Sequence, residues 1–118
     1  MKISEVAERT RLSISTIRYY EKTGICSSIS RGADGKRQFT TTDLDWLLLL
    51  SSLRETGMPT SEMKQFAALY RKGNETVPER KRMLLKHAQH LEDRQTQLNR
   101  CTDILRRKLA KYDEITGK

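Results

Sequence analysis

The stretch from Ser13 to Ile25, SISTIRYYEKTGI, gathers the side chains of this chain that are best suited to binding a polyanion. On a helix with 100° per residue, Ile14, Ile17 and Tyr20 fall on one side. An arginine, a lysine, a serine and the first tyrosine fall on the other, and such groups bind phosphate oxygens and base edges in a major groove. An ordinary amphipathic helix with a solvated face fits the same pattern. The candidate DNA-contacting residues of this stretch are Ser15, Thr16, Arg18, Tyr19 and Lys22.

Two short helices joined by a tight turn must position this face. The segment ISEVAERTRL has its apolar residues at helical spacing, with Ser4 able to cap, and predicts a first helix that ends near Arg11. The second helix begins after the N-cap Ser13, runs to about Thr23 and stops at Gly24. The pair predicts a helix-turn-helix.

A β-hairpin is predicted next, in SSISRGADGKRQFT. Residues 28–31 and 37–39 are the candidate strands, and Asp34 and Gly35 supply the turn chemistry. A cationic hairpin directly after a helix-turn-helix fits a wing that grips the phosphate backbone, although an ordinary polar hairpin fits the same residues. The candidate phosphate-binding residues of the hairpin are Arg31, Lys36 and Arg37.

Two more helices are predicted to cover the core. TTTDLDWLLLLSSLRETGM has threonine caps and early aspartates, and predicts a helix that ends at Gly57, with Trp46 and its leucines inside. A fourth helix over residues 60–71 presents four apolar side chains on one face and ends near Gly73.

Residues 77–113 predict one long helix with a heptad seam. At ~1.5 Å per residue it would extend ~55 Å, which is too long for a small domain to cover, so its apolar stripe favours a partner helix and hence a homodimer. Folding back onto its own core is the alternative. The candidate dimerisation residues are Leu84, Leu91, Leu98, Leu105, Leu109 and Tyr112.

The charge of the chain also bears on its partners. Lysine and arginine number 23 against 15 acids, a net charge of +8. This balance suits a nucleic acid, although an acidic membrane surface or solubility alone would be served equally. No apolar run approaches the ~20 residues of a membrane span and no signal peptide is evident, so we expect a cytoplasmic protein without a membrane partner.

The remaining reactive side chains define no catalytic centre. Cys26 and Cys101 have no CxxC spacing, and both most simply pack as small hydrophobic side chains. Arginines near Cys101 would favour its thiolate. We keep both cysteines as candidate redox residues. His87 and His90 lack an evident third ligand, and we expect no metal site. Without a nucleophile and partner or a glycine-rich phosphate loop, we expect neither an enzyme nor a cofactor.

Together these motifs resemble the MerR-type bacterial transcription regulators over nearly the whole chain. ISEVAERTRLSISTIRYYEKTGI is similar to the family's helix-turn-helix, with its Arg-Tyr-Tyr-Glu signature at residues 18–21, and RGADGKRQFT to its first wing. LRETGMPTSEMKQF resembles the second wing, with Pro59 in place of the commoner serine cap. Phe39 stands where the first wing usually has tyrosine, and so offers no phosphate hydrogen bond.

The resemblance implies a mechanism. In the family two chains pair through antiparallel long helices, bind a pseudo-palindromic promoter with a long spacer, and distort it so that both promoter elements face RNA polymerase. The segments LRETGM and YRKGNETVPERK look most like the aldehyde- and electrophile-responsive subgroup, but Ser52 replaces its reactive cysteine. The start of the long helix, TVPERK, lacks the cysteine of metal-responsive members, so the resemblance leaves the effector unidentified.

We therefore predict a mainly α protein with a winged helix-turn-helix DNA-binding domain at 1–73 and a coiled-coil dimerisation helix at 77–113. Its predicted function is control of transcription by distorting a promoter spacer. A basic coiled-coil interaction protein without sequence-specific DNA binding is the alternative.

Overall fold

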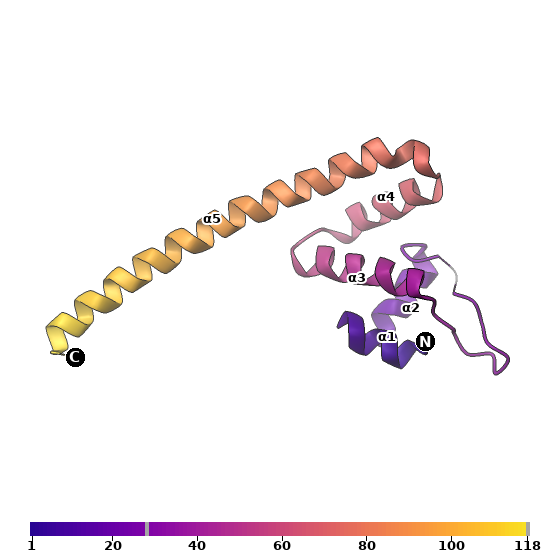
Figure 1. The fold of residues 1–118 in the computed structure, drawn as a ribbon, viewed down its shortest axis with the longest axis horizontal. Helices are drawn as coiled ribbons and strands as arrows, with labels where there is room; N and C mark the ends of the chain where they lie inside the picture. Colours follow the sequence, from indigo (N-terminus) through magenta and orange to yellow (C-terminus); the bar gives the residue numbers. More distant parts are fainter. Residues whose placement is uncertain (28, 118) are drawn as a thin grey trace. The chain divides into compact units, whose positions relative to one another are not determined.

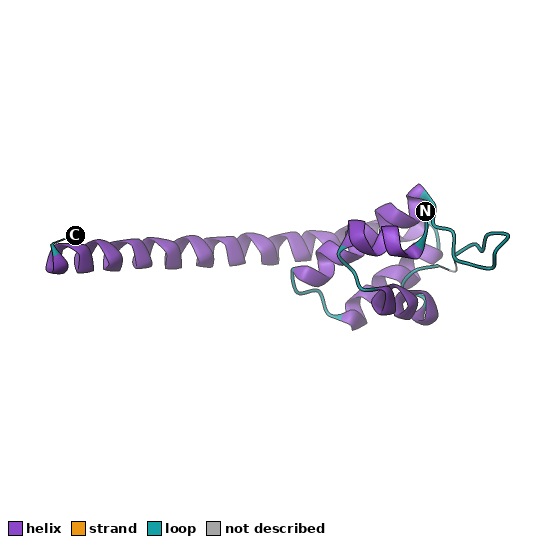
Figure 2. Ribbon diagram, turned by 90° about the horizontal axis from the view of Figure 1, so that it is seen from below, coloured by secondary structure: helices purple, strands orange, loops and turns teal. Residues whose placement is uncertain are grey.

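The computed structural model describes residues 1–27 and 29–117, and Figure 1 shows the order of their helices. Residues 1–81 form one compact unit and residues 82–118 a second. Figure 2 shows helices and loops and no strand in the described chain, so the predicted mainly α fold is confirmed. The elements are α1 (Ile3–Thr10), α2 (Ile14–Thr23), α3 (Thr41–Glu55), α4 (Thr60–Arg71), η1 (Asn74–Thr76, a 3₁₀ turn) and α5 (Val77–Thr116).

The helix-turn-helix forms as predicted, with one correction. Ser13 caps α2 by accepting from the Thr16 N–H at 3.0 Å, and Gly24, with φ 81°, ends it. Ser4 was predicted to cap the first helix, but it lies inside α1. The carbonyl of Lys2 already accepts from the Glu5 N–H at 3.1 Å, so the helix begins earlier than the serine signal indicates.

A shared core holds α1 to α4 together. Ile17, Leu47, Leu50 and Met63, from three of these helices, are each at most 1% exposed. Thr40 and Asp43 form a reciprocal capping box at the start of α3.

Polar bonds fix the helices in place around this core. Ser51 donates from its hydroxyl to the Thr10 carbonyl at 2.6 Å, which ties α3 to α1. Trp46 donates from Nε1 to the Ile25 carbonyl at 2.8 Å, and Arg71 donates to the carbonyl of Gly24. The end of the second helix is therefore held from both α3 and α4.

The hairpin is present, but the two predicted strands are not. Within the described residues the segment forms a single antiparallel bridge, between Arg31 and Arg37, and a turn in which the Gly35 N–H donates to the Gly32 carbonyl at 3.0 Å. Ser28, the start of the first predicted strand, lies outside the described residues. Two short arms without a third strand satisfy too few ladder hydrogen bonds for regular strands.

The N-terminal residue supplies backbone hydrogen bonds to the second arm of the hairpin. The Phe39 N–H donates to the Met1 carbonyl at 2.8 Å, and the Met1 amino group donates back to the Phe39 carbonyl at 2.8 Å. The second arm of the hairpin is thus bonded to the segment that precedes α1. Phe39 is 3% exposed, so it serves the core.

The long helix α5 runs slightly beyond the predicted end at residue 113. It has 40 residues, none of them buried. The apolar side chains of its heptad seam from Leu91 to Tyr112 are open, between 37% exposed at Leu91 and 61% at Leu109, while Leu84 is half-buried. Along the described residues, no helix combines the length and the apolar content that a membrane crossing requires.

Candidate nucleic-acid interface

The outward face of α2 matches the face predicted from helical periodicity. Arg18 and Lys22 are exposed, and Tyr19 is 44% exposed. Tyr20, one position on, is 3% exposed, and its burial raises the pKa of its phenol. The two adjacent tyrosines therefore have different roles, because Tyr19 faces solvent and Tyr20 packs in the core.

The hydroxyl residues at the start of α2 are partly engaged with one another. The Ser13 hydroxyl lies 3.0 Å from that of Ser15 and 2.8 Å from that of Thr16. Ser15 is exposed and Thr16 is half-buried. Ser15 and Thr16 therefore lie beside the cationic face of α2 and also contact the side chain that caps this helix.

Two cations that the sequence prediction did not include lie beside this face. Arg54, in the last turn of α3, places Nη1 3.5 Å from the Thr16 hydroxyl oxygen. Lys64 of α4 holds its Nζ 5.8 Å from the centre of the Tyr19 ring. Both occur in LRETGMPTSEMKQF, the segment that resembles a second wing, and that resemblance was the available signal.

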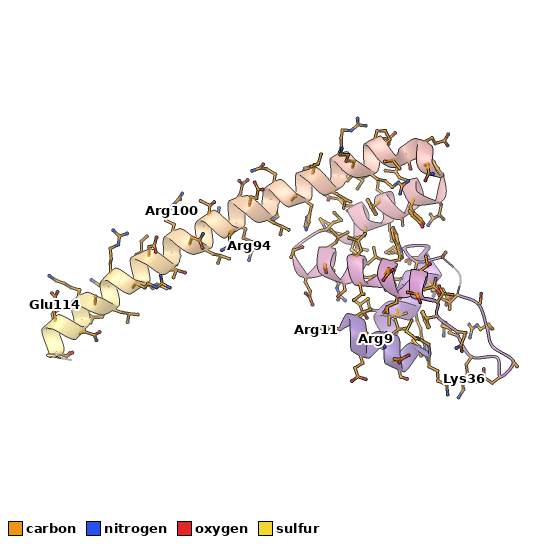
Figure 3. The ribbon with its side chains drawn as sticks, in the orientation of Figure 1. Arg9, Arg11, Lys36, Arg94, Arg100 and Glu114 are labelled. Carbon is orange, nitrogen blue, oxygen red and sulfur yellow. The ribbon has the colours of Figure 1, made fainter. Side chains whose placement is uncertain are left out.

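Arg18, the hairpin and the start of α1 line an open basic hollow of about 370 Å³. The hollow brings together Arg18 and the three hairpin cations that the sequence predicted. Lys2 was not predicted. In Figure 3 the Lys36 side chain lies on the hairpin loop. The residues that line this basic hollow are Lys2, Ile3, Ser4, Arg18, Arg31, Gly35, Lys36 and Arg37.

One of these cations has a partner inside the protein. Arg37 donates from Nε to Glu21 Oε1 at 2.7 Å, while Glu21 Oε2 accepts from the Ile29 N–H at 2.7 Å. Burial alone would raise the pKa of the Glu21 carboxyl, but the Ile29 N–H and the Arg37 guanidinium outweigh it and lower the pKa. Arg37 thus fastens the hairpin to α2, a role that the sequence did not reveal.

The turn holds the Arg31 side chain and the Lys36 backbone in place. Arg31 donates to the Gly35 carbonyl at 3.2 Å, and the Lys36 N–H donates to Asp34 Oδ1 at 3.0 Å. Both side chains are exposed, and neither makes an ion pair with a carboxylate of the described chain. Their charges are available to an anion.

The redox candidates differ in their surroundings. Cys26 is 2% exposed, and burial together with Asp43 and Glu21 raises the pKa of its thiol to about 12. Cys26 therefore stays protonated at neutral pH, which disfavours reaction as a thiolate, and its redox role stays a prediction. Cys101 is exposed on α5.

The histidines are neighbours on α5. The rings of His87 and His90 have centroids 6.2 Å apart. No group of three metal-ligating side chains occurs among the residues that the structure describes.

Comparisons with known proteins agree with this geometry. Residues 1–69 match the model of the MerR HTH family regulatory proteins, and residues 44–111 match the MerR DNA-binding model. An HTH-type transcriptional regulator of Haemophilus influenzae is 34% identical over 94% of this chain and 82% of its own. The regulator YyaN of Bacillus subtilis is 33% identical over 96% of this chain and 91% of its own.

A solved structure extends the likeness to the fold. HiNmlR, a MerR family regulator lacking the sensor domain and crystallised bound to promoter DNA, superposes with a TM-score of 0.84. It is 34% identical to this chain, and the match covers 96% of this chain and 90% of HiNmlR. The chain thus belongs to the MerR family and is a DNA-binding transcription regulator.

Proposed function

We propose that the protein binds a pseudo-palindromic promoter as a homodimer, with α2 in the major groove and the hairpin on the flanking backbone. The observation that carries this proposal is the continuity of the exposed face of α2 with the basic hollow, which share Arg18. Phosphate contacts then fix the register of the protein on DNA, and base contacts supply sequence preference. The proposed DNA contacts are Ser15, Thr16, Arg18, Tyr19, Lys22, Arg31, Lys36 and Arg37.

The proposed dimer forms through α5, in an antiparallel coiled coil. Its support is a 40-residue helix with no buried residue, whose heptad side chains from Leu91 to Tyr112 are exposed to solvent. Burying one such side chain contributes about 1.5–3 kcal/mol, so several pairs can hold two chains together. We assign residues 1–73 to DNA binding and residues 77–113 to dimerisation. The proposed interface residues are Leu84, Leu91, Leu98, Leu105, Leu109 and Tyr112.

A two-fold dimer constrains its operator. Two copies of α2 enter successive major-groove segments at a spacing set by the protein, so the half-sites form a near-palindrome. Bending or untwisting the spacer costs about 1–6 kcal/mol, which multiple phosphate contacts can offset. In this mechanism the bound dimer distorts the spacer until RNA polymerase engages both promoter elements. The protein then acts in the cytoplasm, where bacterial promoters lie, and catalyses no reaction.

Promoters with altered spacers test this mechanism. The spacer between the polymerase elements is shortened by one and by two base pairs, with the protein half-sites intact, and transcription is measured with and without protein. Shortening should raise transcription without protein and abolish activation, because the elements no longer need realignment. A protein-dependent increase of unchanged size in every template would refute distortion and leave DNA binding untouched. Footprinting of the same templates shows whether each is occupied.

A further inference from the structure

The basic hollow beside α2 has a composition that the helix-turn-helix motif does not explain. Its cations come from three separate segments: the residue before α1, the outward face of α2, and the hairpin. The two hydrogen bonds between Met1 and Phe39 hold the first of these segments against the third. Lys2 is thereby fixed beside the hairpin although it lies 29 positions before Arg31 in the sequence.

Most of the positive charge in the basic hollow is not neutralised. Arg37 is paired with Glu21. Lys2, Arg18, Arg31 and Lys36 make no ion pair with a carboxylate in the described part of the chain. Four like charges around one concave surface repel one another, and an anion seated among them relieves that repulsion.

The basic hollow is large enough to hold a phosphate group. A water molecule occupies about 30 Å³ of the liquid. The hollow, at about 370 Å³, therefore has room for a phosphate group with its attached sugar oxygens. Its lining also offers the Ser4 hydroxyl and the backbone of Gly35, which suit oxygen ligands.

We propose that the basic hollow seats one phosphate of the DNA backbone, and that Lys2 is a phosphate-binding residue outside the helix-turn-helix and the hairpin. This inference rests on the proposed DNA binding and makes it more specific. A phosphate held jointly by Lys2 and Lys36 ties the start of α1 and the hairpin to one point on the backbone beside α2. That contact positions the protein on the duplex and carries no sequence information of its own.

The test pairs one protein change with one DNA change. Lys2→Gln is combined with operators in which single phosphates are replaced by neutral methylphosphonates, and affinity is measured across salt concentrations. Lys2→Gln should weaken operator and unrelated DNA alike by roughly 3- to 10-fold, and reduce the salt slope by about one, as expected for one lost phosphate contact. Lys72→Gln, a change of the same charge at an exposed residue outside the hollow, is the control and should leave the slope unchanged.

The decisive measurement is whether the loss of affinity caused by a methylphosphonate is smaller in Lys2→Gln than in the wild-type protein. At one phosphate per half-site, the methylphosphonate should weaken wild-type binding but add little to the loss in Lys2→Gln. Additive losses at every phosphate would overturn the proposal, even if the wild-type protein binds its operator tightly. Absence of any DNA binding by the wild-type protein would instead reject the proposed function.

A second measurement separates backbone phosphate from the free ion. Inorganic phosphate is titrated at constant ionic strength while the amide resonances of Ser4 and Gly35 are followed. Backbone binding predicts that these resonances shift with duplex DNA and move little with millimolar phosphate. Saturable shifts with phosphate, together with additive methylphosphonate losses, would show that the hollow takes a free anion and would overturn the proposal.

Discussion

Replacing Glu21 with glutamine tests whether this carboxylate fastens the hairpin to α2. In the wild-type protein its two oxygens accept from Arg37 and from the Ile29 N–H, each at 2.7 Å. The Glu21 and Arg37 side chains are 15% and 19% exposed, so water only partly replaces these bonds. A hydrogen bond to a charged group contributes about 1.5–3 kcal/mol. Glutamine keeps one carbonyl oxygen and loses the charge, so we expect Glu21→Gln to destabilise the protein by about 2 kcal/mol at pH 7.

The pH dependence of this loss follows from the lowered pKa of Glu21. A carboxyl whose pKa is lower in the folded than in the unfolded protein stabilises the fold above its unfolded value, which is about 4.3 for glutamate. That contribution is lost as the pH falls through the folded pKa. The stability difference between wild type and Glu21→Gln should therefore be full at pH 6 to 7 and shrink below about pH 4.3.

Urea unfolding followed by Trp46 fluorescence measures both effects. Trp46 is the single tryptophan of the chain, and it stacks on Phe66 and Tyr70 in the first compact unit. Glu8→Gln is the matched control, because Glu8 is exposed and makes no ion pair in the described chain. Equal stability of Glu21→Gln and Glu8→Gln at one protein concentration would refute the fastening role. So would a difference between Glu21→Gln and wild type that does not change with pH.

Three further predictions address the other parts of the molecule. Leu91→Asp with Leu98→Asp should give monomers in sedimentation at micromolar concentration and weaken operator binding, and a dimer that persists would exclude this seam as the interface. Arg18→Ala should cost about 1–3 kcal/mol of operator binding and relax base preference in a binding-site selection, as expected for a side chain at a base edge; unchanged affinity and preference would remove it from the interface. Cys101 should react with iodoacetamide at pH 8 in the folded protein while Cys26 does not, since burial keeps the Cys26 thiol protonated; equal labelling would mean that Cys26 is accessible.

Periodicity predicted those features that depend on a single helix. The opposite exposure of Tyr19 and Tyr20 follows from a rotation of 100° per residue. Ser13 begins α2 because its side chain caps the helix, and Gly24 ends it because glycine has no side chain to oppose a positive φ. The boundaries of α4 followed in the same way from its apolar spacing.

Features that depend on tertiary contacts were missed. Lys2 and Arg54 come beside α2 only because α1 and α3 pack around the shared core, and local sequence does not encode that proximity. The prediction of two strands in the hairpin was wrong for a related reason. Residues 37–39 have strand-like composition, but at Phe39 the second arm bonds to Met1, so its pairing is divided between two segments.

The Arg-Tyr-Tyr-Glu signature is then a set of four separate contacts on one turn of helix. Arg18 turns toward the basic hollow, and Tyr19 lies under Lys64 on the open surface. Tyr20 fills the core, and Glu21 holds the hairpin through Arg37. Because successive positions of a helix point 100° apart, four consecutive residues reach four different surroundings. A shift of α2 would therefore disturb the hairpin, the core and the DNA-facing surface together, and the stability lost in Glu21→Gln should be accompanied by weaker operator binding even though the change removes a negative charge.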